Sequence, residues 1–219
     1  MCNTEIKFPR IHHVPLSKGL GRDDRRFGDI TRFFNQPIII TEKLDGENTT
    51  LTRDKIFARS VDSGNHESRD WVKALHGRVA HLLDGYRIHG ENVYAQHSLH
   101  YNNLGSYFYI FGVSTTKNND YLSWEDVCVI AAYLDIPTTP VMYKGECPEV
   151  DIFNMSWLSN GSMFGDEKEG YVVRQAHAFK YNQADFSKYI AKYVRANHVT
   201  SDQHWMHKSV VKNGLRQQA

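Results

Sequence analysis

Three consecutive isoleucines, Ile38–Ile40, are followed within a few residues by Lys43, Asp45 and Glu47. Isoleucine is β-branched and favours strands, so this unbroken run predicts a buried strand over residues 37–43. Burying an unpaired charge costs free energy, so charged side chains seldom follow such a strand unless they are solvated, paired or used. The stretch therefore indicates either a solvated turn at Asp45 or a site that uses these charges.

The order of the expected elements indicates the fold class. The first 35 residues read as an extended lead-in. Strands are expected at 37–43, in an alternating pair within 49–60 that turns at 53–55, and at 85–95, 106–113, 169–174 and 188–194. Helices are expected over 69–84 and 123–135. Strands and helices mix without a regular βαβ alternation, so we expect an α+β fold with antiparallel sheets flanked by helices, rather than a doubly wound one.

Serines precede both expected helices. Ser68 stands where it could cap the first, and Gly85 where it could end it. Ser123 and Asp126 have the spacing of a capping box at the start of the second. Both helices are therefore expected to begin at these serines.

Length and composition fit one globular domain. The chain has 219 residues, of which 41% are hydrophobic and 23% charged. No run approaches the ~20 apolar residues of a membrane span, and the N-terminus is too polar for a signal peptide, so no membrane partner is expected. We expect a single domain over 1–219, with its core at about 36–199 and a short basic extension at 200–219.

The cysteines and histidines bear on location and on metal binding. Cys2, Cys128 and Cys147 are far apart and form no CxxC pair, which fits a reducing cytoplasm. The sequences "HSLH" (97–100) and "HWMH" (204–207) lack a convincing third ligand, so a structural zinc is disfavoured.

The net charge of +1 conceals an asymmetry along the chain. Between Lys117 and Gly170 there are ten acidic and three basic residues, whereas from Tyr171 onward eight basic residues face only Asp185 and Asp202. Such a basic quarter is typical either of a polyphosphate-binding surface or of a solvated helical face. The charge count alone leaves both readings open.

Four short stretches place a charged residue at the edge of a β-rich segment. They are "EKLDG" with Lys43, "HGEN" with Glu91, "EGYVVR" with Glu169 and "AKYVR" with Lys192. Each is weak alone, since a strand often ends in a solvated charge. Together with "ARS" and "YFYIFGV" between them, their order resembles the covalent nucleotidyltransferases: ATP-dependent DNA ligases, RNA ligases and mRNA capping guanylyltransferases. "TEKLDGEN" is most similar to the phage nick-sealing RNA ligases, which have a glutamate before the lysine and an asparagine five positions after it, here Glu42 and Asn48.

The resemblance implies that Lys43 attacks the α-phosphorus of ATP and forms a lysine–AMP phosphoramidate. The amine must be neutral to attack, and at the ordinary pKa of lysine deprotonation at pH 7 costs about 4 to 5 kcal/mol. We therefore expect the site to lower the pKa of Lys43 by desolvation or by a nearby cation such as Lys192 or the metal. Mg²⁺ (or Mn²⁺) would be held by Glu169 and Asp45, directly or through water, with Glu91 as a further candidate.

The resemblance also implies roles for the remaining motif residues. Glu91 is expected to accept hydrogen bonds from the ribose, and Arg59 to contact the nucleotide or the 5′-phosphate strand. Phe111 is the first choice for stacking on adenine and Tyr109, on the same strand face, the second. The cofactor-binding set is then as follows: Glu42, Asn48, Arg59, Glu91, Phe111, Glu169 and Lys192.

The chain departs from the family pattern in two places. The fifth motif usually has two lysines one residue apart, whereas here only Lys192 is present, leaving Lys188 or Arg195 for the second role. Only 27 residues follow Lys192, so we expect no OB-fold domain. The basic extension, with Lys208, Lys212 and Arg216, or a protein partner would then supply the clamp on the substrate.

These observations predict an ATP-dependent RNA ligase that joins nicked or broken RNA ends. Two enzymes compete with this reading, a small DNA ligase and a capping-type guanylyltransferase, and the missing domain disfavours both. An inactive nucleic-acid-binding relative is the alternative from another class. Retention of the lysine, both glutamates and the aspartate disfavours it.

Overall fold

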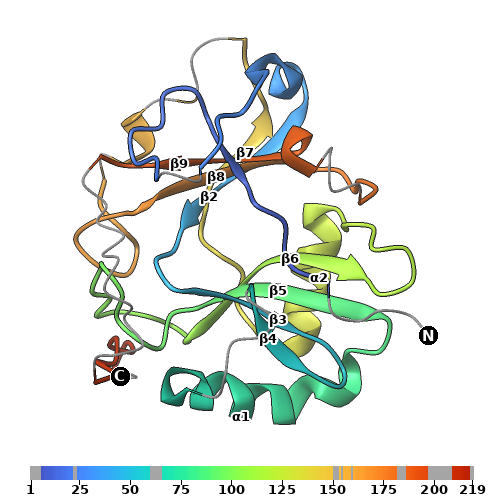
Figure 1. Cartoon of the computed structure of the whole chain (residues 1–219), viewed down its shortest axis with the longest axis vertical. Helices are drawn as coiled ribbons and strands as arrows, with labels where there is room; N and C mark the ends of the chain where they lie inside the picture. Colours follow the sequence, from blue (N-terminus) through green and yellow to red (C-terminus); the bar gives the residue numbers. More distant parts are fainter. Residues whose placement is uncertain are drawn as a thin grey trace.

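The structure, a computed structural model, describes residues 6–21, 24–59, 66–149, 153, 155–158, 160–181, 186–196 and 209–217. Two β-sheets lie one above the other (Figure 1). The five-stranded sheet contains, in spatial order, β1 (His12–His13), β9 (Ile190–Val194), β8 (Gly170–Gln175), β2 (Pro37–Lys43) and β7 (Val141–Glu146). The four-stranded sheet contains β4 (Ile56–Ala58), β3 (Glu47–Leu51), β5 (Tyr86–Asn92) and β6 (Phe108–Thr115). All pairs are antiparallel except β1 with β9, which confirms the expected α+β class.

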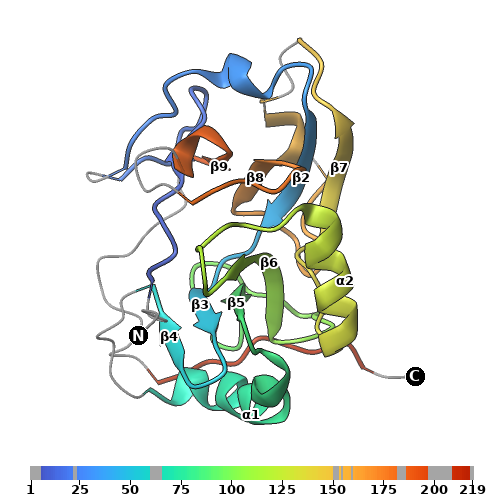
Figure 2. The ribbon, with the colours of Figure 1, turned by 90° about the vertical axis from the view of Figure 1, so that its right-hand side faces the viewer.

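Two α-helices cover the four-stranded sheet. In Figure 2, α1 (Asp70–Val79) runs beneath it and α2 (Trp124–Leu134) stands beside β6. Short 3-10 turns occur at Ile30–Phe33, Glu67–Arg69, Ala80–Leu82, Met155–Leu158 and Phe186–Lys188. No helix among the described residues is long and apolar enough to cross a membrane.

The isoleucine run is buried on both faces of the five-stranded sheet. Successive strand residues point to opposite faces, so Ile39 packs into the core cluster that contains residues of α1 and α2, whereas Ile38 and Ile40 pack with Phe33 and Tyr171. All three isoleucines are inaccessible to solvent. The strand predicted at 37–43 is therefore confirmed, and its lack of polar alternation reflects a sheet covered on both sides.

The expected caps hold for one helix and fail for the other. Ser123 accepts a hydrogen bond from the Asp126 amide, as predicted for a capping box. Ser68 is not a cap: it lies inside the 3-10 turn, and the ring of His66 accepts the bond from the Ser68 amide. The helix predicted over 69–84 is therefore wrong in its extent, because only Asp70–Val79 is α-helical and tight turns flank it.

Two parts of the fold were not apparent in the sequence. Strand β7 pairs with β2 along its whole length, yet its sequence "VMYKGE" shows little hydrophobic alternation. The N-terminal residues expected to form a lead-in instead supply core side chains, namely Phe8, Val14, Phe27 and Phe33. The sequence analysis missed them because their spacing has neither a helical nor a strand period.

The C-terminal residues 209–217 form a strap across the loop that joins β5 to β6. The side chain of Asn213 is buried, accepts a hydrogen bond from the Tyr101 amide at 2.9 Å and donates to the carbonyl oxygens of Val93 and Ala95. Backbone bonds from Gly214 to Tyr101 and from Leu104 to Gly214 extend the strap. This part of the extension is thus packed against the domain.

Candidate active site

Lys43 is the last residue of β2 and shares a face of the five-stranded sheet with Lys192. Residues directly opposite one another in a sheet lie on the same face. Thr41 is opposite Val172, which is opposite Lys192, and Lys43 is opposite Gly170. Alternation along β2 then places Thr41 and Lys43 on one face. The two lysines of the predicted site are thus brought together, although they stand far apart in the sequence.

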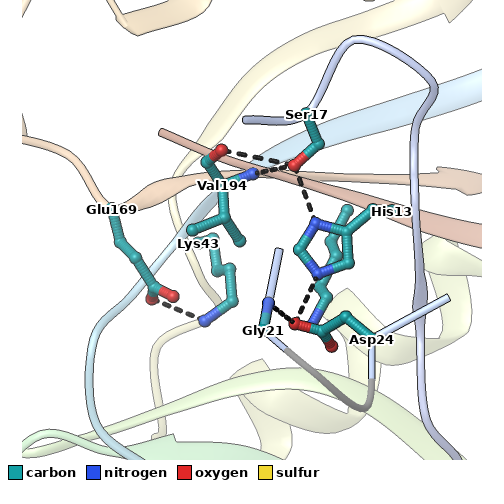
Figure 3. Close-up of polar contacts among 8 residues, drawn as sticks. His13, Ser17, Gly21, Asp24, Lys43, Glu169 and Val194 are labelled. Carbon is teal, nitrogen blue, oxygen red and sulfur yellow. Dashed lines mark hydrogen bonds and ion pairs between the residues drawn. The ribbon is translucent and has the colours of Figure 1, made fainter. Parts of the chain in front are cut away.

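Lys43 forms an ion pair with Glu169, the residue before β8. The distance from Lys43 Nζ to Glu169 Oε2 is 2.5 Å, and Figure 3 shows the two side chains pointing toward each other. Glycine follows Glu169 for a steric reason, because a Cβ on Gly170 would lie 1.8 Å from the carbonyl oxygen of Tyr193. The Glu-Gly pair of this motif therefore combines a charged partner for Lys43 with close packing of β8 on β9.

The pKa of Lys43 is shifted in the direction opposite to the one expected from the sequence. Burial acts to lower the pKa of the Lys43 amine, but Glu169, Glu91 and Asp45 outweigh it, and the pKa is raised. The expectation of a lowered pKa is thus wrong for this arrangement of side chains. Lys43 is a charged ammonium at neutral pH, so the expected role as a nucleophile would require its proton to be removed.

Glu91 reaches the site from the four-stranded sheet. It lies on β5 opposite Asn48 on one side and Tyr109 on the other. Burial is the main cause that raises the pKa of Glu91 to about 8, the carboxylates of Glu169 and Asp45 add to it, and Lys43 opposes it. Glu91 is therefore protonated at pH 7, and its carboxyl can donate one hydrogen bond as well as accept.

Asn48 has a buried side-chain oxygen, Oδ1, that has no hydrogen-bond partner among the residues that the structure describes. A buried acceptor that is left unpaired costs free energy. Asn48 stands beside Glu91 across the strand pair, at the edge of the site. This oxygen is suited to accept a donor from a bound ligand.

Asp45 is held by the loop that follows β5. Its Oδ2 accepts hydrogen bonds from the amides of Ser98 and Leu99, both at 2.7 Å, and its own amide donates to the Tyr101 hydroxyl. Gly46 follows because a Cβ there would lie 2.5 Å from the Asn92 carbonyl oxygen. The carboxylate proposed as a metal ligand thus ties the turn after Lys43 to this loop.

Glu42 lies on the opposite face of β2 from Lys43. Its carboxylate accepts hydrogen bonds from the Ser162 hydroxyl at 2.5 Å and the Met163 amide at 3.4 Å. Burial raises the pKa of Glu42, although these two bonds oppose the shift. Strand alternation therefore points the Glu42 side chain away from that of Lys43.

Phe111 and Tyr109, the two candidates for stacking on a base, differ in burial and in their contacts within the protein. The Tyr109 ring is buried, and its hydroxyl accepts bonds from the amides of Gly105 and Ser106. Phe111 lies at an irregularity in the pairing of β5 with β6, is partly exposed, and packs edge-on against Phe8. Bulges commonly re-aim a side chain beside a site. Phe111 therefore keeps a ring surface for a planar ligand that Tyr109 lacks.

The basic residues of the predicted site are placed differently from one another. Arg59 is exposed and donates its amide to the Asn48 carbonyl, beside the site. Arg195 forms an ion pair with Glu167 at 2.7 Å. Lys188 ends the 3-10 turn before β9. Lys192 is the one of the three fifth-motif candidates that lies within β9.

Lys192 contacts a residue that sequence reasoning missed. Its Nζ lies 3.2 Å from Oδ1 of Asp24, and Oδ2 of Asp24 lies 3.1 Å from Nε2 of the buried His13. Burial lowers the pKa of Lys192, and Asp24 opposes the shift. No periodic pattern marks His13 or Asp24. The pairing of β1 with β9 brings His13 to the site, and the bond from the His13 amide to the Arg25 carbonyl brings the segment of Asp24 beside it.

The carboxylate oxygens of the site are the type of ligand that a magnesium ion prefers. Mg²⁺ prefers oxygen ligands and keeps several waters, and three carboxylates act on the Lys43 amine. Within the described part of the chain, no three histidine, cysteine, aspartate or glutamate side chains form a ready metal-ligand set. A metal at Glu169 or Asp45 would therefore need water or phosphate oxygens to complete its shell. The "HWMH" sequence lies outside the described residues.

Comparison with protein families gives one match, to the RNA ligase family, over residues 36–194. No curated protein sequence matches the chain.

Solved structures of an RNA ligase from Naegleria gruberi have a similar fold. The complex with pyrophosphate superimposes with a TM-score of 0.58 at 17% identity, covering 86% of this chain and 59% of that one. A mutant with ATP and Mn gives a TM-score of 0.56 at 16% identity, covering 76% of this chain and 52% of that one. The chain therefore spans between about half and three fifths of the solved chains that it resembles.

Proposed function

Since the chain belongs to the RNA ligase family, we propose that it is an ATP-dependent RNA ligase with Lys43 as its nucleophile. In the first step, the Lys43 nitrogen forms a bond to the α-phosphorus of ATP while the bond to the β-phosphate oxygen breaks and pyrophosphate leaves. The AMP then passes to a 5′-phosphate end. A 3′-hydroxyl attacks that activated phosphate, the strands are joined, and AMP is released.

The ion pair between Lys43 and Glu169 is the observation that best supports this proposal. The ammonium must lose a proton before it attacks, and Glu169 Oε2, at 2.5 Å, is placed to accept it. An amine this close to a carboxylate in a largely buried site can exchange a proton without bulk water. Glu169 would thus act as the proton acceptor of the first step.

Three further residues are placed to bind the nucleotide. The Glu91 carboxyl can both donate to and accept from the ribose hydroxyls, and Asn48 Oδ1 is an acceptor without a partner. Phe111 offers a partly exposed ring for the adenine. Lys192, on the same sheet face as Lys43, would bind the α-phosphate and stabilise the charge that develops on it.

A divalent cation, Mg²⁺ or Mn²⁺, would be held by the carboxylates of Glu169 and Asp45, directly or through water, and by the phosphates of the nucleotide. Bound there, it would neutralise phosphate charge in the transition state. A mutant of the Naegleria relative was solved with ATP and Mn, which supports the use of a divalent cation.

RNA is the substrate that the family indicates. The C-terminal strap carries Lys212 and Arg216, and Lys208 lies outside the described residues. Contacts to phosphates weaken as salt rises, by roughly 0.7 to 0.9 in log–log slope per phosphate neutralised. We expect few such contacts, and a preference for nicks with RNA on the 3′-hydroxyl side, where 2′-hydroxyls can be read.

Incubation with α-labelled ATP and Mg²⁺, followed by a denaturing gel, tests the proposal. The parent chain should retain the label, whereas Lys43→Ala should not. Lys43→Arg should also fail, because a guanidinium stays protonated. Lys144→Ala, on the edge strand β7, is the matched lysine control and should label like the parent. Label from GTP instead of ATP would indicate a capping enzyme, and label retained by Lys43→Ala would exclude Lys43 as the nucleophile.

A further inference from the structure

Asp24 lies among donors from three separate segments. Its Oδ2 accepts a hydrogen bond from the Gly21 amide at 2.9 Å and lies 3.1 Å from His13 Nε2. Its Oδ1 accepts from Lys192 Nζ at 3.2 Å. Figure 3 shows His13 standing between Ser17 and Asp24, with the Lys43–Glu169 pair close by. Asp24 is therefore fixed on one side and holds Lys192 on the other.

The backbone of β9 anchors this arrangement. Ser17 Oγ accepts a hydrogen bond from the Val194 amide at 2.9 Å and lies 2.7 Å from His13 Nδ1. The Val14 amide donates to the Lys192 carbonyl at 2.8 Å, and the Gly19 amide to the Val194 carbonyl at 3.0 Å. The segment that carries Asp24 is thus fastened to the same strand that carries Lys192.

The protonation of His13 follows from its surroundings. Burial, followed by the charge of Lys192, lowers the pKa of His13 to about 4, so the ring is neutral at pH 7. We assign the ring proton to Nε2, which faces Asp24 Oδ2 at 3.1 Å. Nδ1 lies 2.7 Å from Ser17 Oγ, and the Val194 carbonyl lies 3.2 Å from the same hydroxyl, so the single Ser17 proton is shared between these two acceptors. The ring thus lies between Ser17 and Asp24 without any net charge.

Each of the two lysines of the site is paired with its own carboxylate. Lys43 pairs with Glu169 and Lys192 with Asp24, and the two ammonium groups act on each other. Without Asp24, Lys192 would face the Lys43 cation with a flexible side chain and no direct partner among the described residues. Lys192 is the one fifth-motif candidate within β9, so the orientation of this cation matters for the site.

We propose that Asp24, held by His13 and Ser17, is a positioning residue that orients the Lys192 amine for the adenylation step. This inference rests on the proposed function, since it assigns Lys192 to the α-phosphate. Asp24 itself touches no reacting atom. It keeps Lys192 charged and extended on the sheet face that carries Lys43, from which the amine transfers to the phosphate when ATP binds.

A Ser–His–Asp order invites comparison with a hydrolase triad, but the geometry excludes a nucleophilic role. Ser17 is buried, and its Oγ is hydrogen-bonded to both the amide and the carbonyl of Val194. A nucleophilic serine needs an open approach for its substrate. The cluster therefore serves to hold Asp24.

A double-mutant cycle on single-turnover adenylation tests the proposal. Asp24→Asn should slow AMP transfer by about tenfold or more, which is within the coupling expected for residues in contact. In a Lys192→Ala background, the same change should slow it less than about twofold, because its effect acts through Lys192. Asp84→Asn, an exposed aspartate on another segment, is the matched control and should label like the parent.

A second measurement needs no catalysis. In the ligand-free protein, Asp24→Asn should lower the pKa of the Lys192 amine, because Asp24 raises that pKa. NMR of isotope-labelled lysines measures the pKa. Asp24 is partly exposed, so the variant should melt close to the parent.

The outcomes separate this inference from the proposed function. If the parent takes up no AMP, the proposed function fails, and the NMR measurement alone decides whether Asp24 holds Lys192. If the parent does take up AMP, two results overturn the positioning role. One is an Asp24→Asn variant that takes up AMP as fast as the parent. The other is an Asp24→Asn change that slows AMP uptake in the Lys192→Ala background as much as it does in the parent. Faster labelling by Asp24→Asn would also overturn it, by showing that Asp24 competes with the phosphates.

Discussion

The Lys43 ammonium and the Glu169 carboxylate, 126 residues apart in the sequence, form an ion pair of 2.5 Å across the end of two strands. The pair is largely buried, with Glu169 only 6% exposed at its side chain. Asp45 adds negative charge nearby, so Lys43 balances more than one carboxylate. The stability of the site and its chemistry thus depend on the same ammonium group.

Replacing Lys43 by methionine should lower the free energy of unfolding at neutral pH. Breaking a buried pair costs about 3 to 5 kcal/mol, because the partner charge is left uncompensated, and the partial exposure of Lys43 places it at the lower end. Lys43→Met with Glu169→Leu should recover most of the loss. Urea denaturation measures both, and a single variant as stable as the parent would show that the pair contributes no net stability.

The pH range of this contribution follows from the direction of the shift. The pKa of Lys43 is raised above its ordinary value of 10.5. A lysine with a raised folded-state pKa contributes stability that is fully present below 10.5 and lost only above it. The Lys43→Met deficit should therefore change little with the ionisation of Lys43 between pH 6 and 9.

Glu91 should make stability fall with rising pH as Lys43 does, but within a lower pH range. Its pKa rises from 4.5 when unfolded to about 8 when folded, so the folded state binds the extra proton between these values. Stability should then fall as pH rises from about 4.5 to 8, by up to about 1.4 kcal/mol per pH unit. Glu91→Gln should remove this slope.

The cleanest window for this measurement is pH 6.5 to 8. Below 6.5, His13 and His89 act in the other direction, since burial lowers the pKa of His13 to about 4 and that of His89 to about 3. The unfolded chain then takes up protons that the folded chain does not. Equal slopes for the parent and Glu91→Gln within the window would contradict a neutral Glu91.

Phe111→Leu should raise the KM for ATP while leaving the fold intact. Stacking on a base is worth roughly 1 to 3 kcal/mol, which corresponds to roughly five- to 150-fold in affinity. Tyr109→Phe is the matched control, because it removes the hydroxyl that accepts from Gly105 and Ser106 but keeps the ring. Tyr109→Phe should lower the melting temperature and leave KM unchanged. An unchanged KM in Phe111→Leu would move the stacking role to Tyr109.

Asn213→Ala should destabilise the domain and slow adenylation together. The change leaves the Tyr101 amide and the Val93 and Ala95 carbonyls without their partner, at a cost of about 1 to 3 kcal/mol for each group that stays buried and unsatisfied. These loop residues adjoin Ser98 and Leu99, which hold Asp45, so the loss should reach the turn after Lys43.

The exposed Lys212 on the same strap supplies the control. Its Nζ lies 5.4 Å from the Tyr94 ring, and Lys212→Ala should cost less than about 1 kcal/mol. Thermal unfolding and the AMP-labelling rate measure both variants. An Asn213→Ala variant with normal stability would show that the strap is dispensable for the fold.

Local patterns predicted the parts of the fold that depend on neighbours in the sequence. The isoleucine run identified β2, and the spacing of Ser123 and Asp126 identified the start of α2. Strand β7 was missed because it is an edge strand with no alternation, and Ser68 was misassigned because a serine before an apolar stripe does not reveal which residue takes up cap geometry. Each miss concerns a feature that backbone pairing or turn geometry decides.

The sequence by itself determined which residue types stand at the strand ends: Lys43, Glu91, Glu169 and Lys192 are recognisable because such charges are costly beside apolar strands. Only the tertiary structure decided how they face one another. Strand alternation and sheet register turn Glu42 away from Lys43, and the β1–β9 pairing brings His13 and Asp24 to Lys192. Strand register and the pairing of distant segments depend on packing over the whole molecule, and no local pattern encodes them.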